Sequence, residues 1–159
     1  MSIMTTPWVP QTPHQQAVLD VLLSIRALND AMDRMNGGMK DDMDMNATDL
    51  AALRMMIVRE QRGESVSPHD IAKHLRISTA STTKLLDRLE GAGYIERHPH
   101  PRDRRARILT LTAHSRATFF KHFSEHLEQM RRVTEPYTED ELRLIGRYLT
   151  DVSQAIDPA

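Results

Sequence analysis

Apolar residues recur every three or four positions over most of the chain, a period that predicts a protein built mainly from helices. The first such run covers residues 15–35 and is followed by Gly37 and Gly38, which we expect to end the helix. A loop should then continue to Met45. Asn46, followed three residues later by an acid, has the features of a helix start, and that helix should run to Gly63.

Two short helices are predicted in the middle of the chain. Ser67 as N-cap, Pro68 at the first helical position and Asp70 at the third form a strong start signal for a helix of about two turns. Ser78 can cap a second helix over 79–91, which carries Leu85, Leu86 and Leu89 on its inner face. Because a two-turn helix buries little surface alone, it must lean on the next one, as in a helix-turn-helix.

A β-hairpin should follow, with extended segments at 94–97 and 107–111. Pro99 and Pro101 lie between these two segments and exclude a helix there, since proline disfavours helical geometry in the preceding residue. Thr112 then starts a helix that Pro136 interrupts, and Thr138 starts the last one. The last helix has a heptad-like apolar seam of only about two heptads, at Leu142, Ile145, Leu149, Val152 and Ile156. The predicted fold class is therefore mainly α with a small β-hairpin (α+β).

Charge is segregated along the chain. The 159 residues carry a formal net charge of −1, which excludes a globally basic protein that coats nucleic acid. The 21 basic residues comprise 17 arginines and 4 lysines, and arginine is the side chain suited to bidentate phosphate and base contacts. Residues 97–107 contain five arginines and one aspartate, a net charge of +4. Such a segment is either a solvated loop or a contact with phosphates.

The outer face of the helix over 79–91 favours the second interpretation. It presents small, hydroxylated or basic residues, which let a helix enter the DNA major groove and bond to base edges or phosphates. These residues are Thr79, Ala80, Ser81, Thr83 and Lys84. Serine and threonine at a helix start are often only caps, but here an arginine-rich hairpin follows directly. The combination predicts binding to double-stranded DNA.

Residues 48–133 resemble the MarR (multiple-antibiotic-resistance regulator) family of winged helix-turn-helix transcription regulators. The stretches that carry the resemblance are SPHDIAKHLRIS, STTKLLDRLEGAGYIERHPHPRDRRAR and ILTLT. The resemblance implies that Thr79–Lys84 enter the major groove and that Arg102, Arg104 or Arg105 reach the adjacent minor groove. Asp103 would bond a neighbouring arginine and brace the hairpin tip, and Arg88 would contact the DNA backbone or brace the fold.

Two positions depart from the family pattern. Arg76 occupies the turn site where glycine is common, so the turn must form without a residue that readily takes positive φ. Thr82 stands on the inner helix face, where an aliphatic residue is usual.

The resemblance also implies an architecture and a mode of action. We expect a flexible arm over 1–13, an N-terminal dimerisation helix and loop over 14–45, a winged helix-turn-helix over 46–112 and C-terminal dimerisation helices over 113–159. A cytoplasmic homodimer would bind a pseudo-palindromic operator, acting as a repressor. A small aromatic or anionic effector, for which the sequence identifies no pocket, would modulate it.

Other functions have weaker support. A winged-helix protein-interaction module would not need the arginine-rich tip. A zinc-responsive regulator is suggested by His122 and His126, spaced i, i+4 on one helix, but no third ligand is identifiable. The chain has no cysteine, no nucleophile elbow and no glycine-rich phosphate loop, so neither an enzyme nor a bound cofactor is expected. The sequence contains no run of ~18 apolar residues, so a membrane span is not expected.

Overall fold

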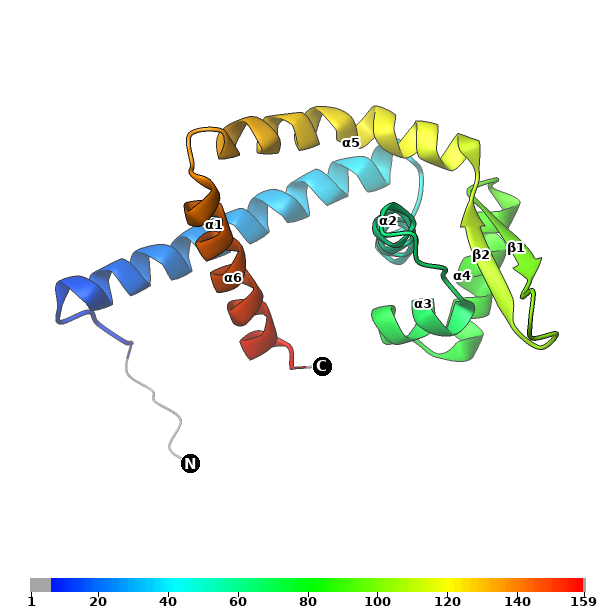
Figure 1. The fold of residues 1–159 in the computed structure, drawn as a ribbon, viewed down its shortest axis with the longest axis horizontal. Coiled ribbons are helices and arrows are strands. Elements are labelled where there is room, and N and C mark those ends of the chain that lie inside the picture. Colours follow the sequence, from blue (N-terminus) through cyan, green and yellow to red (C-terminus); the bar gives the residue numbers. More distant parts are fainter. Residues whose placement is uncertain (1–6, 159) are drawn as a thin grey trace. The chain divides into compact units, whose positions relative to one another are not determined.

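The computed structural model describes residues 7–158. Within this range the chain forms six helices and one antiparallel hairpin, which confirms the predicted mainly α fold with a β-hairpin (Figure 1). The elements are α1 (Pro13–Asp42), α2 (Ala47–Gln61), α3 (Pro68–Leu75), α4 (Thr79–Gly91), β1 (Ile95–Pro99), β2 (Arg107–Leu111), α5 (Ala113–Thr134) and α6 (Glu139–Ile156). The chain divides into two compact units, one ending at Leu111 and the other beginning at Thr112.

Helix α1 is about two turns longer than predicted, and it runs through Gly37 and Gly38 without a break. The expected loop after these glycines was therefore wrong. Met39 and Met43 are buried, and their burial outweighs the cost of about 1 kcal/mol that each helical glycine imposes relative to alanine. The helix is followed instead by Asp44, which adopts a left-handed backbone conformation with φ of 49°.

The N-terminal arm predicted over 1–13 lies partly outside the described residues. Residues 7–11 have no regular secondary structure, and Pro13 already belongs to α1. Thr12 caps this helix, since its Oγ1 accepts a hydrogen bond of 3.1 Å from the backbone N–H of Gln15.

The predicted starts of α3 and α4 are confirmed. Ser67 and Asp70 form a reciprocal capping box, in which each side chain accepts a hydrogen bond from the backbone N–H of the other. Burial by itself raises the pKa of Asp70, but the hydrogen bonds at Ser67, with the charges of Arg59 and His69, lower it overall. Ser78 caps α4 by accepting the N–H of Ser81 at 3.1 Å.

The core of the first unit lies where α2, α3, α4 and the hairpin meet. Each element contributes apolar residues from one face, as its helical or strand period requires. Its most deeply buried members are Leu53 and Met56 of α2, Ile71 of α3, Leu85, Leu86 and Leu89 of α4, and Ile95 of β1. Each large side chain contributes about 1.5–3 kcal/mol when fully buried, so this shared core holds the short helices in place.

Thr82 lies on the buried face of α4, as expected from the sequence, and is only 3% exposed. Its Oγ1 donates a 2.8 Å hydrogen bond to the backbone carbonyl of Ser78. The hydroxyl is therefore satisfied inside the helix, which explains how a polar residue occupies an aliphatic position.

The turn between α3 and α4 depends on Arg76. This residue takes φ of 54°, the left-handed conformation that glycine adopts without strain. The turn therefore does reach positive φ, although a side chain that disfavours it stands there.

The hairpin pairs Ile95 with Leu111 and Pro99 with Arg107. Strand β1 begins one residue later than predicted and continues two residues further, since proline fits the end of a two-stranded ladder. The N–H of Leu109 also donates a 2.8 Å hydrogen bond to the carbonyl of Val66, which attaches β2 to the segment before α3.

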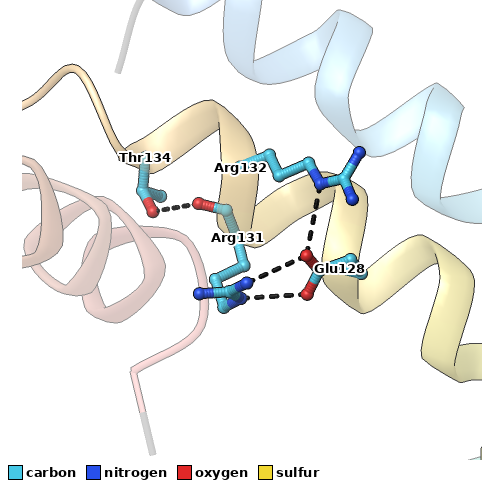
Figure 2. Close-up of polar contacts among 4 residues, drawn as sticks. All are labelled: Glu128, Arg131, Arg132 and Thr134. Carbon is cyan, nitrogen blue, oxygen red and sulfur yellow. Dashed lines mark hydrogen bonds and ion pairs between the residues drawn. The ribbon is translucent and has the colours of Figure 1, made fainter.

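The second unit contains α5 and α6, whose predicted starts at Thr112 and Thr138 are confirmed. Near the end of α5, Glu128 accepts hydrogen bonds from Arg131 and Arg132 (Figure 2). These hydrogen bonds lower the pKa of the Glu128 carboxyl, and the bond from Arg131 is the largest cause.

Both helices of the second unit expose large apolar residues, as does α1 in the first unit. None of the described helices is long and apolar enough to cross a membrane.

We predict that Arg76→Gly is more stable than Arg76→Ala. Both variants remove the guanidinium, but only glycine relieves the strain of positive φ, so the difference should be about 0.5–1 kcal/mol, after part is offset by the greater freedom of glycine in the unfolded chain. Urea denaturation followed by circular dichroism measures it. Arg76→Val should be less stable than Arg76→Ala. Equal stability of the glycine and alanine variants would show that the turn is not strained.

Candidate nucleic-acid interface

The outer face of α4 is exposed at each position predicted from the sequence to contact DNA. Burial of Leu85, Leu86 and Leu89 orients the helix, so that the opposite face points to solvent. Exposed on that face are Thr79, Ala80, Ser81, Thr83 and Lys84. The structure thus brings these residues together on one polar, mostly uncharged surface of a single helix.

The hydroxyl groups of this surface are partly committed to the helix itself. The Oγ of Ser78 donates to the Oγ of Ser81 at 3.0 Å, and the Oγ1 of Thr83 donates to the carbonyl of Thr79 at 3.0 Å. Each of the hydroxyls of Ser81 and Thr83 keeps capacity for a further hydrogen bond. The surface can therefore form hydrogen bonds to base edges or phosphates without first breaking the cap.

The tip of the hairpin, residues 100–106, exposes the predicted arginines Arg102, Arg104 and Arg105. No ion pair holds any of the three within the described part of the chain. Residues 102–107 carry four arginines and one aspartate, a net charge of +3. The tip therefore presents a concentrated positive field at the end of the sheet.

Asp103 bonds a neighbouring arginine as predicted, but through the main chain. Its Oδ1 accepts the backbone N–H of Arg105 at 3.0 Å, a local turn that leaves the guanidinium free of this bond. His100 adds a second brace, because its Nδ1 accepts the backbone N–H groups of Arg102 and Asp103 at 3.0 and 3.1 Å. The bracing role of His100 was not predicted, since nothing in the sequence sets its ring orientation.

Arg97, in the middle of β1, joins this strand to α4. Its Nε donates to Glu90 at 2.7 Å, and its guanidinium also pairs with Asp87. The hydrogen bond that Arg97 donates to Asp87 is the main reason that the pKa of Arg97 is raised, and Glu90 adds to the effect. One of the five arginines counted in the sequence therefore balances acids of α4 and leaves the other four at or near the tip.

Arg88 braces the fold, one of the two roles expected for it. Its Nη2 donates to Oδ1 of Asp49 at 2.9 Å and its Nε lies 3.4 Å from Oδ2, an arrangement in which both carboxylate oxygens are engaged. This pairing raises the pKa of Arg88. The side chain of Asp49 is only 7% exposed, whereas that of Arg88 is 49% exposed. Asp49 was recognised only as an acid in the first turn of α2, because its partner lies 39 residues away.

His122 and His126 occupy the same helix, α5, at the spacing that suggested zinc. Within residues 7–158, no group of three or more histidine, cysteine, aspartate or glutamate side chains is placed to hold a metal ion. The two histidines therefore acquire no third ligand from the described part of the chain.

Among known protein families, residues 45–106 match the model of the MarR family. The chain is 38% identical over 87 residues to the HTH-type transcriptional regulator PecS of Dickeya dadantii, an alignment that covers 52% of each protein. It is 26% identical over 102 residues to the HTH-type transcriptional repressor YetL of Bacillus subtilis, covering 64% of this chain and 61% of that protein. The matched region thus spans little more than half the length of these relatives.

The fold is also similar to the crystal structure of S. aureus MepR in its DNA-binding conformation. The two share a TM-score of 0.68 at 19% identity, over 86% of this chain and 98% of MepR. This similarity confirms the winged helix-turn-helix fold, with β1 and β2 as the wing, and extends over most of the chain.

We predict that Arg88→Met is less stable than the double variant Asp49→Leu/Arg88→Met. The single change leaves a buried carboxylate without its cation, whereas the double change removes both charges. Thermal unfolding of the wild type, the two single variants and the double variant forms a complete cycle. If Arg88→Met unfolds at the same temperature as the double variant, the ion pair does not hold α4 against α2.

Proposed function

Because residues 45–106 match the model of the MarR family, we propose that the chain is a sequence-specific regulator of transcription of this family that binds double-stranded DNA and acts as a repressor. The observation that carries the proposal is the exposed polar face of α4, followed by an arginine-rich wing tip, where residues 102–107 have a net charge of +3. The fit to MepR in its DNA-binding conformation and the repressor YetL among the relatives support it.

The two surfaces have different roles in this proposal. Thr79–Lys84 of α4 lie in the major groove, where short side chains allow the helix to approach the base edges. Arg102, Arg104 and Arg105 insert into the adjacent minor groove, whose negative potential attracts guanidinium groups. Arg88 contacts the DNA backbone only secondarily, since it is engaged with Asp49, and Asp103 keeps the tip in shape.

We propose further that the regulator is a homodimer. Apolar residues of α1 and of the second unit stay exposed in the single chain, and a second copy would cover them. They include Val21, Leu22, Leu28, Met32, Leu127, Met130, Leu142, Ile145 and Leu149. In this arrangement 14–45 and 113–159 supply the dimer contacts and 46–112 binds DNA. Two-fold symmetry places two α4 helices about 34 Å apart, one turn of a pseudo-palindromic site.

The regulator would act in the cytoplasm, without catalysis and without a resident cofactor. A small effector would change its affinity for DNA by favouring one spacing of the two α4 helices. The alternative of a protein-interaction module explains the exposed face of α4 but leaves the arginines of the tip without a purpose.

Selection from random DNA tests the proposal directly. The purified chain is incubated with a library of random duplexes, and the retained fragments are sequenced and confirmed by gel shift. A pseudo-palindrome with half-sites about one turn apart is expected. Retention of fragments without a shared motif would contradict sequence-specific recognition.

Arg104→Ala should weaken DNA binding and reduce its salt dependence. Removal of this cation makes the slope of log K against log salt shallower, by about 0.9 for each phosphate charge that is no longer neutralised. Fluorescence anisotropy at several salt concentrations measures the slope. Arg143→Ala is a matched control, because Arg143 is an exposed arginine of α6 that pairs with Glu139 and Asp140. An equal effect of both variants would mean that the tip has no special contact.

Leu149→Asp should convert the dimer to a monomer, because it places a charge in the apolar seam of α6. Sedimentation velocity at micromolar concentration reports the change. Gln154→Asp, on another side of the same helix, introduces the same charge and should leave the dimer intact. A wild-type protein that sediments as a monomer would refute the dimer.

A further inference from the structure

The ring of His100 organises the loop at the wing tip. This loop, residues 100–106, joins β1 to β2, and Figure 1 shows it projecting beyond α3 and α4. The Nδ1 of His100 accepts the backbone N–H groups of Arg102 and Asp103 at 3.0 and 3.1 Å. The backbone N–H of His100 donates to the carbonyl of Ala106 at 3.2 Å. His100 therefore bonds to both sides of the loop that carries the exposed arginines.

The two hydrogen bonds to Nδ1 determine the protonation state of the ring. A backbone N–H can only donate, so an atom that accepts two of them must have a lone pair and no proton. The ring is therefore neutral, with its proton on Nε2. A protonated imidazole has an N–H on both nitrogens, and the one on Nδ1 would point at the two donors that Nδ1 now accepts. Protonation of His100 therefore removes both hydrogen bonds.

Pro101 makes these two N–H groups the nearest backbone donors that follow His100. Proline has no N–H and fixes φ at about −65°, so the next donors along the chain are those of Arg102 and Asp103. Asparagine and aspartate form turns of the same kind by accepting an N–H two residues further on. Unlike an amide oxygen, the Nδ1 acceptor is lost when a proton binds. Histidine is the side chain that ordinarily takes up a proton between about pH 5 and 8, and His100 is only half-buried.

The charged groups near His100 belong to the loop and to the strands that lead into it. They are the cations Arg102, Arg104, Arg105 and Arg107, the acids Asp103 and Glu96, and a second titratable ring, His98. Asp103 is already engaged with the backbone N–H of Arg105. The Nε2 of His98 lies 2.8 Å from the Oγ1 of Thr110, so this ring contacts β2 and not the loop.

A proton on His100 has two opposite effects on a bound phosphate backbone. It adds a positive charge beside residues 102–107, whose net charge is already +3, and this charge strengthens the attraction. It also releases the loop, which weakens binding because the arginines are no longer held in place. Salt separates the two effects, since it screens the added charge and leaves the loss of the hydrogen bonds unchanged.

We propose that His100 is a positioning residue of the wing. Its neutral ring holds Arg102, Arg104 and Arg105 in the arrangement that fits the minor groove, and its protonation releases them. DNA affinity at high salt therefore falls in acid. The effect on DNA rests on the proposed function, whereas the release of the loop is a property of the free protein and can be measured without DNA.

Nuclear magnetic resonance of the full chain without DNA tests the release of the loop. The backbone amide resonances of Arg102 and Asp103 should shift together in the wild type between about pH 8 and about pH 5.5. They should stay in place in His100→Asn, because the asparagine Oδ1 accepts the same N–H groups and does not titrate. Wild-type resonances that do not move, or that move equally in His100→Asn, would overturn the proposal.

Fluorescence anisotropy at about 0.3 M salt, with a duplex obtained by the selection from random DNA, tests the effect on binding. Between about pH 8 and about pH 5.5, wild-type affinity should fall about three- to tenfold relative to that of His100→Asn, because two hydrogen bonds are lost. Comparison with His100→Asn cancels the titration of the other histidines. His100→Gln places its amide near the position of Nε2 instead of Nδ1, so it should bind more weakly than His100→Asn already at the higher pH.

His98→Gln is the matched control, because it removes the neighbouring titratable ring and keeps an amide near the position of Nε2. It should show the wild-type dependence on pH, and circular dichroism verifies that each variant is folded. Affinities of the wild type and His100→Asn that change in parallel with pH would overturn this inference and leave the proposed function intact. A protein that binds no duplex at any pH would refute the proposed function, and the amide resonances would still decide whether His100 releases the loop.

Discussion

The orientation of α4 depends on the burial of one of its faces, which leaves the opposite face exposed to a partner. The packing of the rest of the first unit depends on this burial. Leu85, Leu86 and Leu89 are each at most 2% exposed, so the helix cannot rotate about its axis without exposing them. Helices α2 and α3 and the hairpin supply the opposing apolar surface. The short α3 is stable only as part of this core, because two turns of helix do not persist alone.

Two sets of ion pairs add to the apolar core by fixing how α4 sits against α2 and how β1 sits against α4. Arg88 ties α4 to the start of α2 through Asp49, and Arg97 ties β1 to α4 through Asp87 and Glu90. The pairs of Arg97 hold the wing against α4, and the pair of Arg88 holds α4 against α2. The arginines of α4 and the wing therefore have two roles. Some guanidinium groups hold the fold together, and those at the tip remain available to a partner.

Most element starts could be predicted because they depend on neighbouring residues. A serine or threonine cap satisfies backbone N–H groups within three residues, as Ser67, Ser78 and Thr138 do. The end of α1 could not be predicted in this way. Gly37 and Gly38 locally favour a stop, but the burial of Met39 and Met43 decides the outcome, and burial depends on a second helix.

The sequence by itself determined the order of elements, the inner and outer faces of α4 and the charge of the wing tip. These follow from periodicity and from caps, which act over a few residues. Only the tertiary structure decided that Asp49 pairs with Arg88 and that Arg97 pairs with acids of α4 instead of lying free near the tip. Such pairings join residues on different elements, and their geometry exists only after the chain has packed.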